Sequence, residues 1–361
     1  PSAIAFFPWI AVDEPLTIGS VRLIPYARGS LPGDSPNVQQ RDVDGILAAY
    51  ASRKNTPISM ATLLEVDDWK LGEDTAGKAG DLFRTRDLIA FAALARRRLF
   101  HGHFDYCNAD CYQLVIQNYT PGQAGSFSFG TRRRDGGYRI MWGTDDFAFY
   151  RPLHVASIER VKLDEPLLVA LQAADSKAQL PHAAIVEFNL ANTDSSDVPQ
   201  HTEVVMTKSA FEHLFEIGTK VDVFVDALLA LVPERQRGAK FKGPLVDRWR
   251  ERFPKATRLL EMWAREFCDL RGGAAHGAER GGKRFVWSSH AHLAFASVLF
   301  PLTVKQRLAQ QGFLEMSQRD SIELTRVEAY LTHDPFDAAL VDDDSHPWRQ
   351  VEADVSNEML R

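Results

Sequence analysis

The stretch that decides the fold reads Met262-Trp-Ala-Arg-Glu-Phe-Cys-Asp-Leu-Arg-Gly-Gly-Ala-Ala-His-Gly277. Within it, Arg271 and His276 place one fixed cation and one titratable imidazole five positions apart. A guanidinium can hold a phosphate through two parallel hydrogen bonds, and it stays charged at any cellular pH. An imidazole exchanges protons near neutrality. The pair therefore has the chemistry needed to cut RNA.

The two glycines between the pair decide how its members would lie. On an unbroken helix, five positions correspond to about 500° of rotation, which would point the two side chains well apart. Glycine is unfavourable inside a helix and favourable at its end. We therefore predict that one helix ends between Leu270 and Gly273 and that another begins after His276.

Apolar spacing predicts further helices on both sides of this stretch. Pro181 stands at a starting position of a helix that is predicted to run to Asn192. Three more helices are predicted over residues 202–217, 246–270 and 284–311, and a short one around residues 164–166 leads into this half of the chain.

With these helices around it, the segment resembles the RxxxxH signature of the HEPN superfamily, and the quoted stretch is similar to its Apea-like branch. Ala210-Phe-Glu-His-Leu-Phe215 resembles a second string of that branch. The resemblance covers about residues 178–315, under half of the chain. It implies an all-α bundle that acts as a metal-independent endoribonuclease of the toxin or anti-phage defence kind, with Arg271 and His276 as its catalytic residues.

The resemblance also implies a mechanism and partners. His276 would take the proton from a ribose 2′-OH or deliver one to the 5′ leaving oxygen, while Arg271 holds the scissile phosphate. One histidine per chain cannot easily serve as both base and acid, and dimerisation through the helical domain would bring two motifs together. The expected partners are RNA, a second copy of the chain and an antitoxin or defence-system protein, with no cofactor and no metal.

The chain departs from the family at Gly272, where the family usually has a polar residue. This departure bears on the strength of catalysis rather than on the fold. Asp269, two positions before the arginine, is a candidate supporting residue, and a solvated carboxylate at a helix end is the alternative. A second hypothesis is a non-catalytic HEPN-like module that dimerises and binds nucleotide or RNA. A third is a nucleic-acid-binding regulator that uses only a basic segment.

That basic segment stands just before the motif. The net charge of −6 argues against a protein that coats nucleic acid over its whole surface, but residues 233–258 carry nine Lys and Arg against three acids. Such a cluster can hold a polyphosphate through counterion release, and a solvated face is the alternative. The candidate RNA-binding residues are Arg248, Arg252, Lys255 and Arg265.

Residues 331–361 form a segment of opposite charge, with eight acids against two arginines. We predict an acidic C-terminal tail here. Two interpretations stay open: a solvated tail, and a segment that docks on the basic residues and restrains the nuclease. Its apolar anchors would be Val341, Trp348, Val351 and Met359.

The N-terminal part of the chain has a different texture. Strands are predicted over residues 17–26, 59–66, 111–118, 126–132 and 138–142, and helices over residues 43–53 and 82–98. The predicted class is therefore α+β, with a mixed α/β N-terminal domain over residues 1–155 and an all-α HEPN-like bundle over residues 156–330. We hypothesise that the first domain acts as a sensor.

Composition places the chain among soluble globular proteins with room for two domains, at 361 residues and 45% apolar content. Three cysteines give no disulfide framework, which favours the cytoplasm. The apolar start contains Pro8 and lacks a basic leader, so it is a poor signal peptide. The longest apolar run, residues 291–304, is shorter than a membrane span, so no membrane contact is expected.

One cluster has the composition of a zinc site. His101, His103, Cys107 and Cys111 supply four zinc-type ligands within eleven residues. We predict that they are unliganded, because Cys111 begins an apparent strand and no second ligand pair supports the cluster. Whether they bind a metal stays open at this point.

Overall fold

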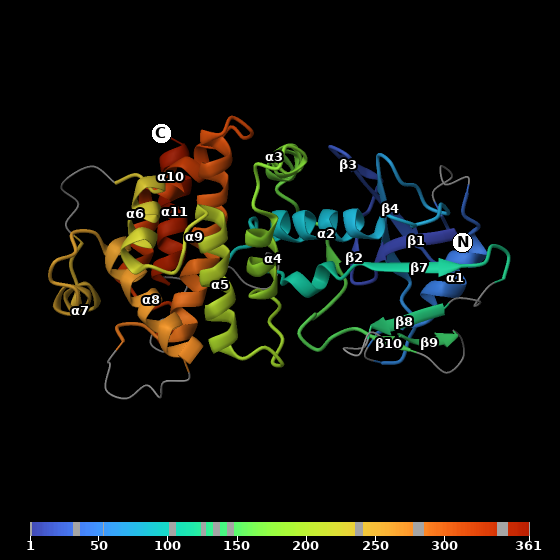
Figure 1. Cartoon of the computed structure of the whole chain (residues 1–361), viewed down its shortest axis with the longest axis horizontal. Helices are drawn as coiled ribbons and strands as arrows, with labels where there is room; N and C mark the ends of the chain where they lie inside the picture. Colours follow the sequence, from blue (N-terminus) through green and yellow to red (C-terminus); the bar gives the residue numbers. More distant parts are fainter. Residues whose placement is uncertain are drawn as a thin grey trace. The chain divides into compact units, whose positions relative to one another are not determined.

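The computed structural model describes residues 2–31, 37–52, 54–100, 106–123, 128–132, 138–142, 148–234, 241–276, 285–337 and 346–360. The chain divides into two compact units. The first consists of Pro1–Ala93 and Cys107–Gln172, and the second of Leu94–Tyr106 and Ala173–Arg361. All described strands lie in the first unit (Figure 1), which confirms the predicted α+β class. The predicted boundary at residue 155 lies within the first unit.

The first unit is built on a five-stranded antiparallel sheet. Its order is β3 (Leu16–Ile18), β4 (Val21–Ala27), β6 (Met60–Val66), β1 (Ser2–Phe7) and β7 (Val115–Tyr119). Because β1 lies between β6 and β7, its residues from Ala3 to Phe7 are fully buried. The apolar start of the chain, for which no strand was predicted, is therefore a core strand.

Several predicted elements of this unit have different bounds. Residues 17–26 form a hairpin of two strands instead of one, because Gly19 adopts a φ of 57° in the turn between them. The segment predicted as a strand from Cys111 begins with a 3₁₀ turn over Ala109–Tyr112. Three short strand pairs and three helices complete the unit: β2 (Ile10–Ala11) with β11 (Glu159–Arg160), β5 (Tyr50–Ala51) with β10 (Phe149–Tyr150), β8 (Ser128–Arg132) with β9 (Tyr138–Trp142), and α1 (Gln40–Leu47), α2 (Ala79–Leu94) and α3 (Glu165–Ser176).

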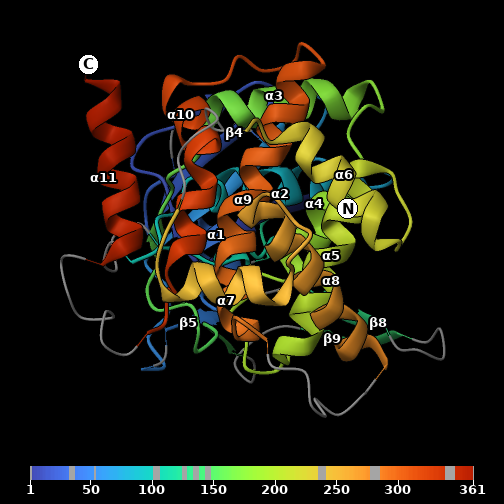
Figure 2. The same ribbon diagram turned by 90° about the vertical axis from the view of Figure 1, so that its left-hand side faces the viewer.

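The second unit is helical throughout its described part and is centred on α5, which packs against α4, α8 and α9 (Figures 1 and 2). Phe211 of α5 makes edge contacts with Phe224, Trp263 and Phe300, so aromatic rings from four helices meet in one core. The helices are α4 (His182–Leu190), α5 (Gln200–Phe215), α6 (Val221–Leu231), α7 (Pro244–Arg252), α8 (Leu259–His276), α9 (Ser289–Gln310), α10 (Gln318–Arg326) and α11 (Pro347–Met359).

The single helix predicted over residues 246–270 is two helices. α7 ends at Arg252, and α8 begins at Leu259. Pro254 explains the interruption, because proline disfavours helical geometry in the residue before it and offers no N–H to the helix. Phe253 accordingly leaves the helix with φ −126° and ψ 67°. The helix α6 was not predicted.

α8 corrects the prediction of a helix break. It continues through Gly272 and Gly273 and ends at His276. Two glycines disfavour a helix by roughly 1 kcal/mol each, but the burial of Trp263, Phe267 and Leu270 stabilises this helix by more. Positions 271 and 276 are therefore separated by about 140° around one helix axis, beyond a full turn.

The described part of the acidic segment is folded. η3 (Val327–Thr332) and α10 pack against α11, whose Trp348 and Val355 are buried. The indole of Trp348 donates to the Tyr330 carbonyl at 3.0 Å, and Arg326 of α10 forms ion pairs with two α11 carboxylates. α11 is thus a structural helix rather than a solvated tail, and it packs against α10 and η3. Val341 lies outside the described residues.

Candidate functional site

Arg271 lies in the last turns of α8 and is partly buried. Its Nε is shielded from solvent and has no hydrogen-bond partner among the described residues. A partly buried guanidinium without a partner is costly, because its donors lose water without gaining an acceptor. Such a group suits an anion supplied from outside the chain, such as a phosphate.

The candidate RNA-binding arginines are instead engaged within the protein. Arg248 donates to the backbone carbonyls of Phe285 and Val286, and Arg265 pairs with Glu261 and Asp222 at 3.1 and 2.9 Å. These contacts hold the start of the α9 region to α7 and hold α6 to α8. Lys255 is exposed and has no hydrogen bond or ion pair among the described residues, so it stays available to a phosphate.

Arg252 is the most firmly engaged of the four candidates. Its Nε lies 2.8 Å from a carboxylate oxygen of the fully buried Glu266, and its Nη2 donates to Asp269 at 3.1 Å. The ring of Phe285 lies 4.9 Å from its guanidinium carbon. Arg252 therefore serves the internal structure. Asp269, the candidate supporting residue, pairs with Arg252 rather than with Arg271.

Glu266 organises the contacts of the middle of α8. Its carboxylate accepts hydrogen bonds from the backbone N–H groups of Val286 and Trp287 at 2.9–3.1 Å and lies 3.1 Å from Nε2 of His292. With Arg252 it forms a buried ionic network. The network ties the chain just before α9 to α8, so it fixes where the start of α9 lies relative to the middle of α8.

His292 is enclosed by aromatic rings. The rings of Trp249, Trp263, Phe267 and Trp287 have centroids 5.8–6.3 Å from its imidazole. Burial lowers the pKa of His292, and the neighbouring Glu266 opposes this effect. A histidine in this setting is a packing residue that is neutral near pH 7 and does not act as a proton shuttle to solvent.

Cys268 lies one turn before Arg271 on the same helix and is buried. Burial raises the pKa of its thiol to about 11. A thiol of this kind stays protonated near neutrality and is a poor nucleophile. Cys268 is therefore unsuited to act as a nucleophile.

His276, the second residue of the motif, occupies the last position of α8, and its side chain lies outside the described residues. The structure therefore brings the two positions onto one helix without fixing the distance between the two functional groups. The zinc-type cluster is similarly incomplete, since His101 and His103 lie outside the described residues. Cys111 is buried, and its thiol donates to Asn108 at 3.5 Å. Across the described ranges, no three His, Cys, Asp or Glu residues are arranged to hold a metal.

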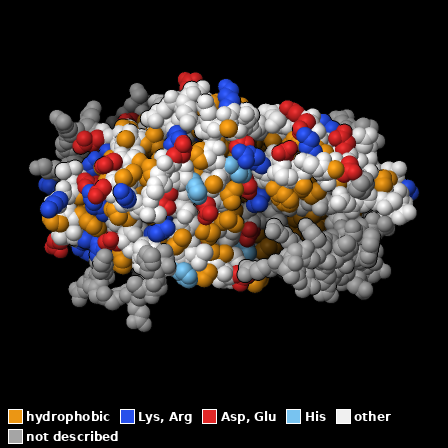
Figure 3. Space-filling view, viewed as in Figure 1, with side chains coloured by type: hydrophobic (Ala, Val, Ile, Leu, Met, Phe, Trp, Pro, Cys, Tyr) orange, Lys and Arg blue, Asp and Glu red, His pale blue; other side chains and the backbone are white. Residues whose placement is uncertain are grey.

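The surface of the second unit is mixed in charge. On the face that Figure 3 shows, basic and acidic side chains are interspersed over its helices. None of the helices in the described part of the chain combines the length and the apolar content needed to cross a membrane.

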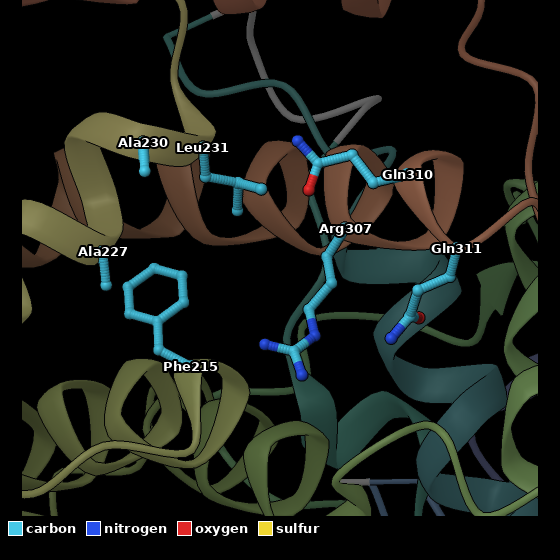
Figure 4. Close-up of a pocket in the computed structure, with 7 residues that line it drawn as sticks. All are labelled: Phe215, Ala227, Ala230, Leu231, Arg307, Gln310 and Gln311. Carbon is cyan, nitrogen blue, oxygen red and sulfur yellow. The ribbon is translucent and has the colours of Figure 1, made fainter.

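A cavity of about 340 Å³ lies where α5, α6 and α9 end. Arg307, Phe215 and Leu231 point toward it (Figure 4), but Arg307 also binds Glu216. The Glu266 network places the middle of α8 beside the start of α9. Trp263 contacts Phe295, so the two helices run antiparallel, and this cavity lies at the other end of α9. The cavity is therefore remote from Arg271.

Comparison of the chain with family models, characterised proteins and solved structures finds no match. The role of Glu266 was missed by the sequence analysis. A signal for it exists, since Glu266 stands between Trp263 and Phe267 on a helix face whose other members are apolar. A carboxylate at such a position must find internal donors.

Proposed function

We propose that the chain is a metal-independent endoribonuclease of the HEPN type, with Arg271 and His276 as its catalytic residues. The observation that carries the proposal is the partly buried guanidinium of Arg271, whose Nε has no partner among the described residues, on the helix that ends at His276. Every other arginine of α7 and α8 has an ion pair or a hydrogen bond within the described structure.

The reaction follows from the chemistry of the two groups. A base removes the proton of a ribose 2′-OH, the 2′ oxygen attacks the adjacent phosphorus, and the bond to the 5′ oxygen breaks. An acid protonates the leaving 5′ oxygen, which leaves a 2′,3′-cyclic phosphate and a 5′-OH. Arg271 holds the phosphate and its developing charge, and His276 transfers a proton.

The unbroken helix favours a site that two chains share. Positions about 140° apart on one axis diverge, whereas a two-fold axis can place the arginine of one copy beside the histidine of the other. A homodimer through the helical unit would then hold two such composite sites, each with Arg271 from one copy and His276 from the other. A toxin or anti-phage role, with an antitoxin or defence-system partner, belongs to the same proposal.

One alternative has an observation in its favour. A non-catalytic HEPN-like module that dimerises and binds nucleotide or RNA would need Arg271 but no alignment with His276. The helical continuity through Gly272, where the family usually has a polar residue, is compatible with it. The two functions differ in whether RNA is cut.

Incubation of the full chain with a single-stranded RNA in EDTA tests the proposal. The wild type should yield products with 2′,3′-cyclic phosphate ends, and Arg271→Ala and His276→Ala should each abolish them. Arg271→Ala removes no internal hydrogen bond of the described structure, so the free energy of unfolding of this variant should lie within about 0.5 kcal/mol of the wild-type value.

Matched controls come from the same unit. Arg307→Ala removes an arginine at the far end of α9, and His213→Ala removes an exposed histidine of α5, so both should cleave as the wild type does. Equal cleavage by Arg271→Ala would overturn the assignment of the arginine. RNA binding without cleavage by the wild type would establish the non-catalytic module instead.

A further inference from the structure

A cavity of about 290 Å³ lies in the second unit, between the α4–α5 connection, the start of α9 and residues 97–100 and Tyr106. The C-terminal end of α8 and the starts of α5 and α9 lie at the same lower end of this unit in both views (Figures 1 and 2). The cavity therefore opens at the end of the bundle that carries Arg271. Its volume is near the lower limit for small-molecule sites.

Aromatic rings form much of its wall. The ring of His290 stacks on Phe336 with centroids 3.8 Å apart, and Phe336 lies 5.6 Å from Phe100. Tyr106 completes the wall, and its hydroxyl donates to Asp194 at 2.7 Å. Flat rings fixed by their neighbours form a surface on which a planar heterocycle can stack.

The polar lining consists of a carboxylate and a guanidinium. Glu203 is partly buried, and its carboxylate has no hydrogen bond or ion pair among the described residues. Burial, and then the charge of Asp194, raise the pKa of Glu203, so an ionised carboxylate here is under-solvated. Arg97 lines the cavity and is about nine-tenths buried. Asn192 accepts a hydrogen bond from its Nη2, and its guanidinium carbon lies 5.7 Å from the ring centroid of Tyr106.

We propose that this cavity binds a guanine base of single-stranded RNA, with Glu203 accepting hydrogen bonds from the base and Arg97 donating to it. Guanine presents two adjacent donors, N1–H and the 2-amino group, beside the O6 acceptor. The two oxygens of a carboxylate can accept hydrogen bonds from both donors at once, and O6 can accept one from a guanidinium N–H.

The other bases fit this edge less well. Adenine and cytosine each present one amino donor beside a ring acceptor, and uracil presents one N–H between two carbonyls. Each would leave an acceptor facing the carboxylate, and an unpaired polar group in a partly buried site is costly. A phosphate is disfavoured at this end of the cavity, because Glu203 and Asp194 both line it. The aromatic wall would stack any base, so selectivity rests on the polar edge.

The inference rests on the proposed function only for RNA as the source of the base. Its test is binding to the full chain, measured by calorimetry with guanosine, inosine and adenosine. Inosine lacks the 2-amino group and should bind at least about tenfold more weakly than guanosine, and adenosine should bind more weakly still. The nucleoside series needs no variant, so misfolding does not enter this comparison.

Two variants and one control locate the site. Glu203→Gln should lower guanosine affinity at least about tenfold, because the amide supplies one acceptor and one wrongly placed donor. Phe336→Leu keeps an apolar side chain but removes the stacking partner, and should weaken all three nucleosides together, by roughly tenfold. Asp197→Asn removes an exposed acid of the same α4–α5 connection that does not line the cavity, and should leave binding unchanged.

The outcomes separate this inference from the nuclease. Undetectable guanosine binding, equal affinity for adenosine, or unchanged affinity in Glu203→Gln would each overturn the guanine site, whether or not the chain cuts RNA. Guanosine binding with the expected selectivity in a chain that fails to cleave RNA would support the guanine site while the proposed nuclease fails.

Discussion

The carboxylate of Glu266 is fully buried, and it holds groups from two other parts of the chain against the middle of α8. It accepts from the N–H groups of Val286 and Trp287 and pairs with Arg252 of α7. A buried ion pair adds little stability relative to a well-packed apolar pair, but removing one partner leaves an uncompensated charge. The single residue thus determines the local arrangement far more than an exposed carboxylate would.

Glu266→Gln should therefore lower the free energy of unfolding by about 3–5 kcal/mol, because it leaves Arg252 facing a neutral amide. Asp222→Asn is the matched control, since Asp222 also pairs with an arginine but its side chain is 80% exposed. That change should cost under about 1 kcal/mol. Urea unfolding of both variants measures the difference, and equal costs would show that the Glu266 network is not an energetic centre.

His292 makes a second prediction at this scale. Its pKa is lowered by burial in the folded chain and returns to the ordinary value of 6.5 on unfolding. Between these two pKa values the unfolded chain binds more protons than the folded one, so folding stability rises with pH through that window. The contribution of His292 is present above pH 6.5 and is lost as the pH falls below it. Burial lowers the pKa of His290 and His333 in the same direction.

Urea titrations between pH 8 and pH 5 should show this loss in the wild type. His292→Gln should reduce the slope below pH 6.5, because the glutamine cannot take up the proton. His201→Gln changes an exposed histidine and should keep the wild-type slope. A slope that His292→Gln leaves intact would assign the pH dependence to other groups.

Among the elements, the last turns of α8 bear directly on the proposed site. Gly272 and Gly273 stand inside the helix, and a Cβ built at either position meets no other atom within 4 Å. Gly272→Ala and Gly273→Ala should each raise the free energy of unfolding by roughly 0.5–1 kcal/mol, because alanine loses less backbone entropy in a helix.

A third glycine is the control for this prediction. Gly243 precedes α7 with a φ of 132°, and it also has open space around its Cβ position. Gly243→Ala should destabilise by about 1 kcal/mol or more, because the backbone conformation excludes a side chain. Thermal unfolding of the three variants measures all of these effects. Destabilisation by both α8 alanines would indicate that the helix ends at the glycines, as the sequence pattern had predicted.

The elements that the sequence predicted are those whose signal is local. The strand over residues 138–142 and the helix after Pro181 depend on alternation and on a start signal, and both are present in the structure. β1 and the continuation of α8 depend on burial against segments far along the chain, which no local pattern contains. The same reason explains α11, whose Trp348 is buried although its segment is acidic.

The candidate site likewise has features that the sequence could predict and features that depend on tertiary contacts. Arg271 was chosen for its chemistry, and its lack of a partner is compatible with that choice. Arg252 and Asp269 were chosen for charge and position, and their pairing with each other depends on how α7 packs on α8. Charge can be read from a sequence, whereas whether a charge is already neutralised depends on tertiary contacts.

At the scale of the whole molecule, the chain passes between the two units three times, after Ala93, Tyr106 and Gln172. The helical unit is therefore not one continuous segment. Leu94–Tyr106 supplies Arg97, which donates to Asn192, and Phe100, which stacks on His346. A fragment that begins at residue 173 would lack these contacts, so the assays above require the full chain.

A shared site makes a quantitative prediction for mixed chains. If each site takes Arg271 from one copy and His276 from the other, a dimer of Arg271→Ala with His276→Ala holds one intact site and one doubly altered site. Random pairing of equal amounts makes half of the dimers mixed. One half of the sites in one half of the dimers is intact, so the mixture should recover about a quarter of wild-type cleavage.

The two variants alone should remain inactive, and they provide the baseline. The chains should be mixed under conditions that allow the subunits to exchange, and sedimentation should confirm a dimer before and after mixing. Arg307→Ala mixed with His276→Ala serves as the matched control. Because the Arg307→Ala chains keep both motif residues, half of all composite sites in that mixture retain Arg271 and His276, and cleavage should be about half of the wild-type value. An inactive mixture of the two motif variants beside an active control would place both residues of a working site in one chain, and a monomer that cleaves RNA would exclude the shared site altogether.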